Sequence, residues 1–144
     1  MIADQEVLSE VENSWEGMLR TRARVQSAIV SPLGAPGSMA FMISDLAHNL
    51  PFIQAFAVLN DALLQIRDEG HFRSKKFFLG ALVDASERHL DWIDFTLVKE
   101  GVRRLNDVAR HGEILARKDC WRYTAAVEAK LTAWAIIPDL TEDN

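Results

Sequence analysis

The sequence predicts an all-α fold, a helical bundle of about five main helices. Along most of the 144 residues, apolar side chains recur at spacings of three and four, which is the period of an amphipathic helix. No stretch alternates apolar and polar residues in the β-branched-rich pattern of a strand. Because 49% of the residues are hydrophobic and 26% are charged, the composition fits one domain spanning residues 1–144.

The first half of the chain contains an N-terminal helix over residues 4–30 and a loop over residues 31–38. The loop, SPLGAPGS, has two prolines and two glycines, which end a helix. A short helix is expected over residues 39–48. Pro51 then fits the first turn of a further helix, with Asn49 as its cap and a natural stop at Gly70.

Three helices are expected in the second half of the chain. The first covers residues 77–90, in about three turns. The second is capped by Asp91 or Asp94 and ends at Gly112, and the third starts at residue 118 and is stopped by Pro138. One apolar stripe of the last helix is expected to face the core, and it consists of Cys120, Tyr123, Val127, Leu131 and Trp134.

The net charge and the cysteine content limit the classes of protein to which the chain can belong. The formal net charge of −5 argues against a protein that is held to nucleic acid by bulk positive charge. Cys120 is the single cysteine, which fits a cytoplasmic protein without an internal disulfide. The most apolar region, residues 39–59, is interrupted by Asp45, His48, Asn49, Pro51 and Gln54. No uninterrupted apolar run approaches the roughly 18 residues that a membrane span needs, so no membrane partner is expected.

The stretch RRLNDVARHGE, residues 103–113, carries the candidate catalytic residues. Arg104 and His111 are seven residues apart, so on a helix they project at nearly the same angle, while Asn106 and Glu113 project from the other side of the apolar stripe. A histidine can transfer protons near neutral pH and an arginine can hold a phosphate, so the pair suits metal-free RNA cleavage. The alternative is structural, with Arg104 paired to Asp107 or Glu100 and His111 favoured by the helix dipole.

The chain resembles the HEPN superfamily (higher eukaryotes and prokaryotes nucleotide-binding) over residues 39–138. The resembling pieces are FAVLNDALLQIRDEGHF, LGALVDASERHLDWIDFTLVKEGVRRLNDVARHGEIL and RKDCWRYTAAVEAKLTAW. The resemblance implies a small all-α domain, a two-fold homodimer and, in many members, a ribonuclease that needs no metal or cofactor. It also implies a toxin–antitoxin or defence setting, with RNA as substrate and a cognate antitoxin as partner.

The motif departs from the Arg-Asn-x-x-Ala-His form that is typical of the family. Matched on Asn106 and Ala109, the sequence has Leu105 and Arg110 at the two catalytic positions. The other match uses Arg104 and His111. Three functions therefore stay open. The first is a ribonuclease with Arg104 and His111 as catalytic residues, and the second is an inactive HEPN-like domain that binds RNA, a nucleotide or a protein. The third is a helical interaction module with no nucleic-acid role.

Basic residues outside the pair are candidates for RNA contact. The connection HFRSKK places Arg73, Lys75 and Lys76 among aromatic residues, a combination that suits a nucleic-acid backbone. The alternative is a solvated connection that Phe72, Phe77 and Phe78 anchor to the core. The predicted RNA-binding residues are Asn106, Arg110, Arg73, Lys75 and Lys76. A further cluster, of Asp84, Glu87 and Asp91, is expected to be a solvated acidic face without a metal.

Overall fold

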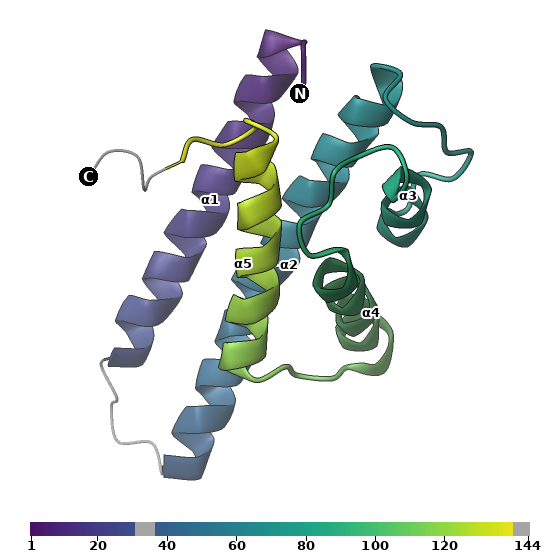
Figure 1. The fold of residues 1–144 in the computed structure, drawn as a ribbon. Coiled ribbons are helices and arrows are strands. Elements are labelled where there is room, and N and C mark those ends of the chain that lie inside the picture. The colour runs from purple at the N-terminus through teal and green to yellow at the C-terminus, as the bar shows by residue number, and fades with distance from the viewer. Residues whose placement is uncertain (31–36, 140–144) are drawn as a thin grey trace.

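The computed structural model describes residues 1–30 and 37–139, and the side chains of residues 1–27 and 44–139. The described residues form five helices and no strand, which confirms the all-α prediction (Figure 1). The helices are α1 (Gln5–Val30), α2 (Gly37–Asp68), α3 (Leu79–Ser86), α4 (Phe95–His111) and α5 (Arg117–Ala133). Of the predicted loop over residues 31–38, residues 31–36 lie outside the described residues, and residues 37 and 38 belong instead to the first turn of α2.

Helix α2 is the centre of the arrangement. It packs against α1, α3 and α5, while α4 packs against α3 and α5 (Figure 1). Buried apolar side chains from all five helices form a shared core around α2, whose Phe52, Phe56, Leu59 and Leu63 are fully buried. The predicted apolar stripe of α5 is buried too.

The prediction of two helices separated at Pro51 is wrong, because Pro51 lies inside the continuous helix α2. A proline inside a helix loses one backbone hydrogen bond and costs about 3 kcal/mol. Packing on both sides of the proline offsets this cost. Before it, His48 contacts Trp121 of α5, and after it Phe52 contacts Tyr123 of the same helix.

Two predicted helix ends are also corrected. Helix α3 ends at Ser86 and not at residue 90, because the chain turns there and buries Leu90. Helix α5 ends at Ala133, well before Pro138, with Ala135 in the left-handed conformation at φ 57°. The turn buries Ile136, whose backbone N–H donates to the Leu131 carbonyl, so the αL position is held by alanine instead of glycine.

Gly101 is where α4 comes closest to its neighbours. A Cβ at this position would lie 2.5 Å from Cζ of Phe56 on α2 and 3.3 Å from Cβ of Tyr123 on α5. The first distance is shorter than carbon atoms tolerate. Only glycine therefore lets α4 pack against the Phe56 ring in this geometry.

We expect Gly101→Ala to lower the free energy of unfolding by about 1–2 kcal/mol, measured by urea denaturation. Overpacking costs about 1–3 kcal/mol, and the better helix propensity of alanine returns up to about 1 kcal/mol. Gly17→Ala on α1 is the matched control, because its nearest neighbour there is the flexible end of Arg20 at 3.7 Å. The control should gain about 0.5–1 kcal/mol. Equal effects in the two variants would contradict the close packing at Gly101.

Candidate functional site on helix α4

Helix α4 is amphipathic, and its apolar stripe is more deeply buried in the first half of the helix than in the second half. The stripe is buried over the first half of the helix, at Val98, Gly101 and Val102. Over the second half, Leu105 and Val108 are only partly buried and Ala109 is exposed. The candidate catalytic residues sit beside this partly covered half.

Arg104 is held by two carboxylates on the side of α4 where the helical wheel puts it. Its Nη1 atom lies 3.4 Å from Asp107 Oδ2 and 3.3 Å from Glu113 Oε2. The predicted pairing with Asp107 is confirmed, whereas Glu100 pairs elsewhere. Glu113 was expected on the opposite side, but α4 ends at His111 and Gly112 adopts a left-handed φ of 64°, so the helical wheel no longer applies to residue 113.

His111 is exposed in the last turn of α4. Its imidazole forms no hydrogen bond or ion pair with any described residue, and it lies near the helix carbonyls that favour a positive charge. The side chain is therefore free to meet a ligand.

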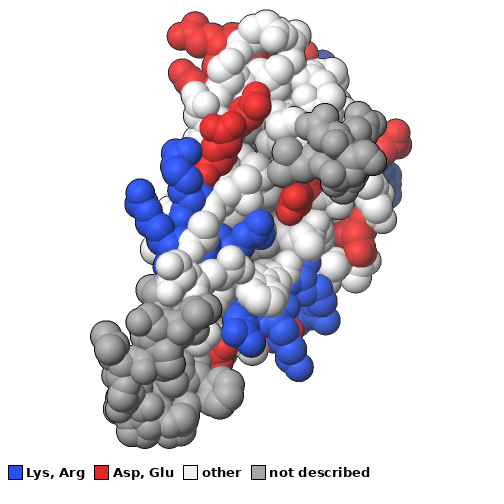
Figure 2. Space-filling model, turned by 90° about the vertical axis from the view of Figure 1, so that its left-hand side faces the viewer, with Lys and Arg blue, Asp and Glu red and all other residues white. Residues whose placement is uncertain are grey.

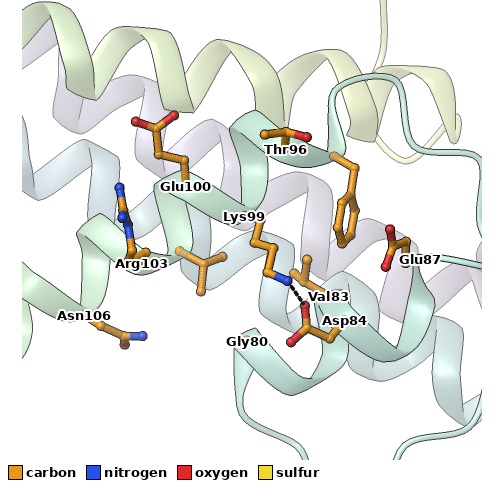
Figure 3. Close-up of a pocket in the computed structure, with 11 residues that line it drawn as sticks. Gly80, Val83, Asp84, Glu87, Thr96, Lys99, Glu100, Arg103 and Asn106 are labelled. Carbon is orange, nitrogen blue, oxygen red and sulfur yellow. Dashed lines mark ion pairs between the residues drawn. The ribbon is translucent and has the colours of Figure 1, made fainter.

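Asn106 lies on a different side of α4, in a groove between α3 and α4 that is called the α3–α4 groove below. Figure 3 shows Asn106 beside Arg103 at one end of this groove. The predicted RNA-binding asparagine is therefore not brought together with Arg104 and His111. Arg110 is exposed in the last turn, also without an ion pair to a described residue.

The basic connection between α2 and α3 is solvated, as its composition predicts. Arg73, Lys75 and Lys76 are exposed, and among the described residues no hydrogen bond or ion pair joins them to Arg104 or His111. The expected anchoring by three phenylalanines is only partly right. Phe72 is buried, but Phe77 is 71% exposed and Phe78 is 59% exposed, because the chain between residues 73 and 78 runs outside the core before α3 begins.

The structure also gives a role to polar residues that interrupt the apolar part of α2. Asn49 is buried and forms a pair of hydrogen bonds with Leu115, accepting from its N–H at 3.1 Å and donating to its carbonyl at 3.0 Å. Asp45 accepts a hydrogen bond from the backbone N–H of Arg117 at 3.0 Å. Asn49 was predicted to cap a helix. Together with Asp45 it instead fastens the connection between α4 and α5 to α2.

His48 is the buried histidine of this region, and sequence reasoning gave it no role. Its Nδ1 donates to the Ser44 carbonyl at 2.8 Å, since a carbonyl can only accept. Its ring lies edge-on to Trp121 with centroids 5.6 Å apart, and the Arg117 guanidinium covers the same indole at 5.2 Å. Trp121 is 41% exposed. The signal in the sequence was the polar run within an apolar helix.

A polar network joins α4 to α5 behind the groove. The Tyr123 hydroxyl donates to Glu100 Oε1 at 3.0 Å, and Arg122 donates to the same hydroxyl at 3.2 Å. Burial raises the pKa of Tyr123, and Glu100 raises it further while Arg122 opposes the shift. Glu100 is thus turned toward α5 and is not free to hold Arg104.

Positive charge also gathers away from α4. Helix α1 carries acidic residues in its first half and Arg20, Arg22 and Arg24 in its second half. Figure 2 shows this face, which carries both basic and acidic side chains. Since α1 and α4 lie on opposite sides of α2 in Figure 1, these arginines do not add to the charge around Arg104.

Comparison of the chain with protein-family models, with curated proteins and with solved structures finds no match.

No helix among the described residues combines the length and apolarity needed to cross a membrane. Within the same residues, no group of three metal-ligating side chains could hold a metal ion. Asp84, Glu87 and Asp91 are each exposed, and Asp84 forms an ion pair with Lys99 at 3.1 Å.

Cys120 is buried beneath the α4–α5 connection and is not built as a nucleophile. Burial, with smaller contributions from Asp119 and Asp45, raises the pKa of its thiol to about 12. A raised pKa keeps the thiol protonated at neutral pH, and the thiolate is the reactive form.

We expect native Cys120 to react with a disulfide reagent such as DTNB at pH 8 on the order of 1000-fold more slowly than the urea-unfolded chain, because the thiolate fraction falls with the raised pKa. Absorbance of the released thiol measures both rates, and Cys120→Ser gives the blank. A native rate close to the unfolded rate would show that this thiol is accessible and ionised.

Proposed function

We propose that this chain is a HEPN-like helical domain that acts as a two-fold dimeric binding module and does not cleave RNA. The observation that carries the proposal is the pairing of Arg104 with both Asp107 and Glu113. These three side chains sum to one negative charge, and Nη1 of the guanidinium, one of the nitrogens that would hold a phosphate, already faces both carboxylates.

Electrostatics explain why this arrangement disfavours cleavage. A phosphodiester entering beside Arg104 brings another negative charge close to two carboxylates, and stabilising a cleavage transition state needs donors aimed at developing negative charge. Asn106 cannot compensate, because it opens onto the α3–α4 groove. The overall charge of −5 acts in the same direction.

The partly covered stripe of α4 supports the dimer. Leu105 and Val108 stay partly exposed and Ala109 is exposed, with the exposed Ile114 following in the connection. An apolar helix face of this kind is buried when a second copy packs on it. Residues near a two-fold axis then meet their own copies.

A ribonuclease is the second candidate, and one observation favours it. His111 is exposed and lies beside the partly exposed apolar stripe of α4, on the side of the helix that carries Arg104. In a dimer through α4, two copies of Arg104 and His111 would approach one cleft. If the chain is such a ribonuclease, RNA is its substrate and an antitoxin protein covers the cleft.

An RNA cleavage assay distinguishes the binding module from the ribonuclease. We expect no cleavage of a fluorescent RNA in EDTA by the wild type, by His111→Ala or by the double variant Asp107→Asn with Glu113→Gln, which frees Arg104 from its carboxylates. Gel analysis of the products checks this result. Cleavage by the wild type that His111→Ala abolishes would establish the ribonuclease, and cleavage only after Arg104 is freed would show a masked active site.

A charged side chain introduced into the partly exposed apolar stripe of α4 tests the dimer. We expect the wild type to be a dimer at micromolar concentration by light scattering. Ala109→Glu should weaken it on the order of 100-fold, because like charges meet near the axis. Ala23→Glu on α1 makes the same change at an exposed helical site and should leave the dimer intact. Circular dichroism verifies that both variants are folded. A monomeric wild type would remove the dimer from the proposal.

A further inference from the structure

The connection between α2 and α3 exposes two adjacent phenylalanines. Phe77 is 71% exposed and Phe78 is 59% exposed, although Phe72 at the start of the same connection is buried. Figure 1 shows the connection extending beyond α2 and α3 at the edge of the molecule, on the side of α2 that is away from α1. Neither exposed ring lines the α3–α4 groove. Exposed apolar groups of this size mark a surface that meets a membrane or a partner.

The same connection is locally basic, although the whole chain has a net charge of −5. Arg73, Lys75 and Lys76 are exposed, and their side chains form no ion pair with a described residue. Residues 70–83 contain no aspartate or glutamate. Glu69, the acidic residue just before them, accepts hydrogen bonds from backbone N–H groups at the start of the chain and is turned toward that segment. Three positive charges therefore lie beside the two exposed rings without a negative charge among them.

Two interactions determine how these side chains are presented. The Ser74 hydroxyl donates to the Lys76 carbonyl at 2.6 Å, which closes a turn just before the rings. The Lys76 ammonium lies over the face of the Phe78 ring, 5.7 Å from its centroid. A lysine beside an apolar group can keep its charge in water while that group is buried. The face of Phe78 that Lys76 covers is also closed to a stacking nucleotide base.

We propose that the connection formed by residues 73–78 binds an anionic lipid surface through its two exposed rings and its three basic side chains. The rings enter the boundary between headgroups and acyl chains, and the basic side chains contact lipid phosphates. Reversible binding to a bilayer surface combines these two contributions, and the connection supplies both. A protein that lies on a bilayer needs no spanning helix, so the expectation of no membrane partner applies to crossing alone. This inference rests neither on the α4 dimer nor on the absence of RNA cleavage.

Single-stranded RNA is the other anionic partner that basic and aromatic residues suit, and the sequence predicts RNA contact by the same three basic residues. Two observations favour the lipid surface. The rings stand at a protruding turn, and one face of Phe78 is already covered by Lys76. In addition, an extended RNA runs along the protein and meets its net negative charge, whereas a bilayer touches only the protruding connection. Repulsion of the remaining chain by the bilayer is screened beyond about 10 Å at about 0.1 M salt.

Co-sedimentation of the full chain with lipid vesicles tests the proposal. One kind of vesicle is pure phosphatidylcholine, and the other also contains phosphatidylserine. We expect the anionic vesicles to bind the protein on the order of 100-fold more tightly, because each basic residue near the surface contributes roughly fivefold. Soluble glycerophosphoserine has the same headgroup without acyl chains. At the concentration of the phosphatidylserine it should not displace the protein, because the rings require the apolar boundary.

The contribution of the rings is tested by Phe77→Ala with Phe78→Ala. This double variant should bind the anionic vesicles on the order of tenfold more weakly, because less apolar surface leaves water. Leu46→Ala with Leu50→Ala is the matched control, since it removes two large apolar side chains of α2 that are 56% and 51% exposed. The control should bind like the wild type. Circular dichroism verifies that both variants are folded.

The contribution of the charges is tested by replacing the three basic residues of the connection with glutamine. This triple variant should bind the anionic vesicles on the order of 100-fold more weakly. The matched control makes the same change at three basic residues of α1, so both variants lose the same net charge. The control should bind the anionic vesicles like the wild type, because α1 lies on the other side of α2 (Figure 1). The control consists of Arg20→Gln, Arg22→Gln and Arg24→Gln.

Binding of a fluorescent single-stranded RNA to the same variants is measured by anisotropy. Absence of vesicle binding by the wild type, equal binding to neutral and anionic vesicles, or equal loss in a variant of the connection and its matched control would overturn the proposal. RNA binding that the variants of the connection abolish, without vesicle binding, would overturn it in favour of a nucleic-acid site. None of these results bears on RNA cleavage or on the dimer.

Discussion

The close approach of α4 to the rest of the bundle at Gly101 is the constraint on which the other features of the structure depend. The Phe56 ring of α2 occupies the space that a Cβ of residue 101 would need. This contact places the backbone of α4 against the Phe56 side chain and within reach of α5, where Glu100 accepts a hydrogen bond from Tyr123. A wider spacing would open the core around Phe56 and separate the buried ends of that polar network.

The same contact determines how the chemistry of α4 is divided. Once Gly101 and its apolar neighbours face α2 and α5, Arg104 and His111 must point to one side of the helix and Arg103 and Asn106 to the other. The first side holds a guanidinium that is neutralised by its own carboxylates. The second side faces α3 across an apolar groove. One helix thus presents two polar surfaces that differ in charge and in the helices beside them.

The polar residues of α2 show a second way in which the bundle is held together. A buried amide is costly unless its hydrogen bonds are satisfied. The buried Asn49 amide bonds the backbone of Leu115. The partly exposed Asp45 carboxylate accepts a hydrogen bond from the backbone N–H of Arg117, which has no helical partner at the start of α5. Ala116 at the N-cap position supplies no side-chain bond, and Asp45 of a different helix does so instead. The connection after α4 is therefore positioned by side-chain hydrogen bonds as well as by apolar packing.

Periodicity in the sequence was sufficient to determine the all-α class, the amphipathic character of α4 and the buried stripe of α5, and it reduced the expected partners of Arg104 to Asp107 or Glu100. Each of these follows from spacings within one helix, where residues three, four or seven apart share a side regardless of the rest of the chain. The continuity of α2 through Pro51, the early end of α5 and the roles of Asn49 and Asp45 depend on contacts between segments far apart in the chain. The α3–α4 groove and the turn that brings Glu113 to Arg104 depend on how helices meet and end. The spacing of residues within one helix contains no information about contacts between segments that are far apart in the chain. Only the tertiary structure therefore decided these features.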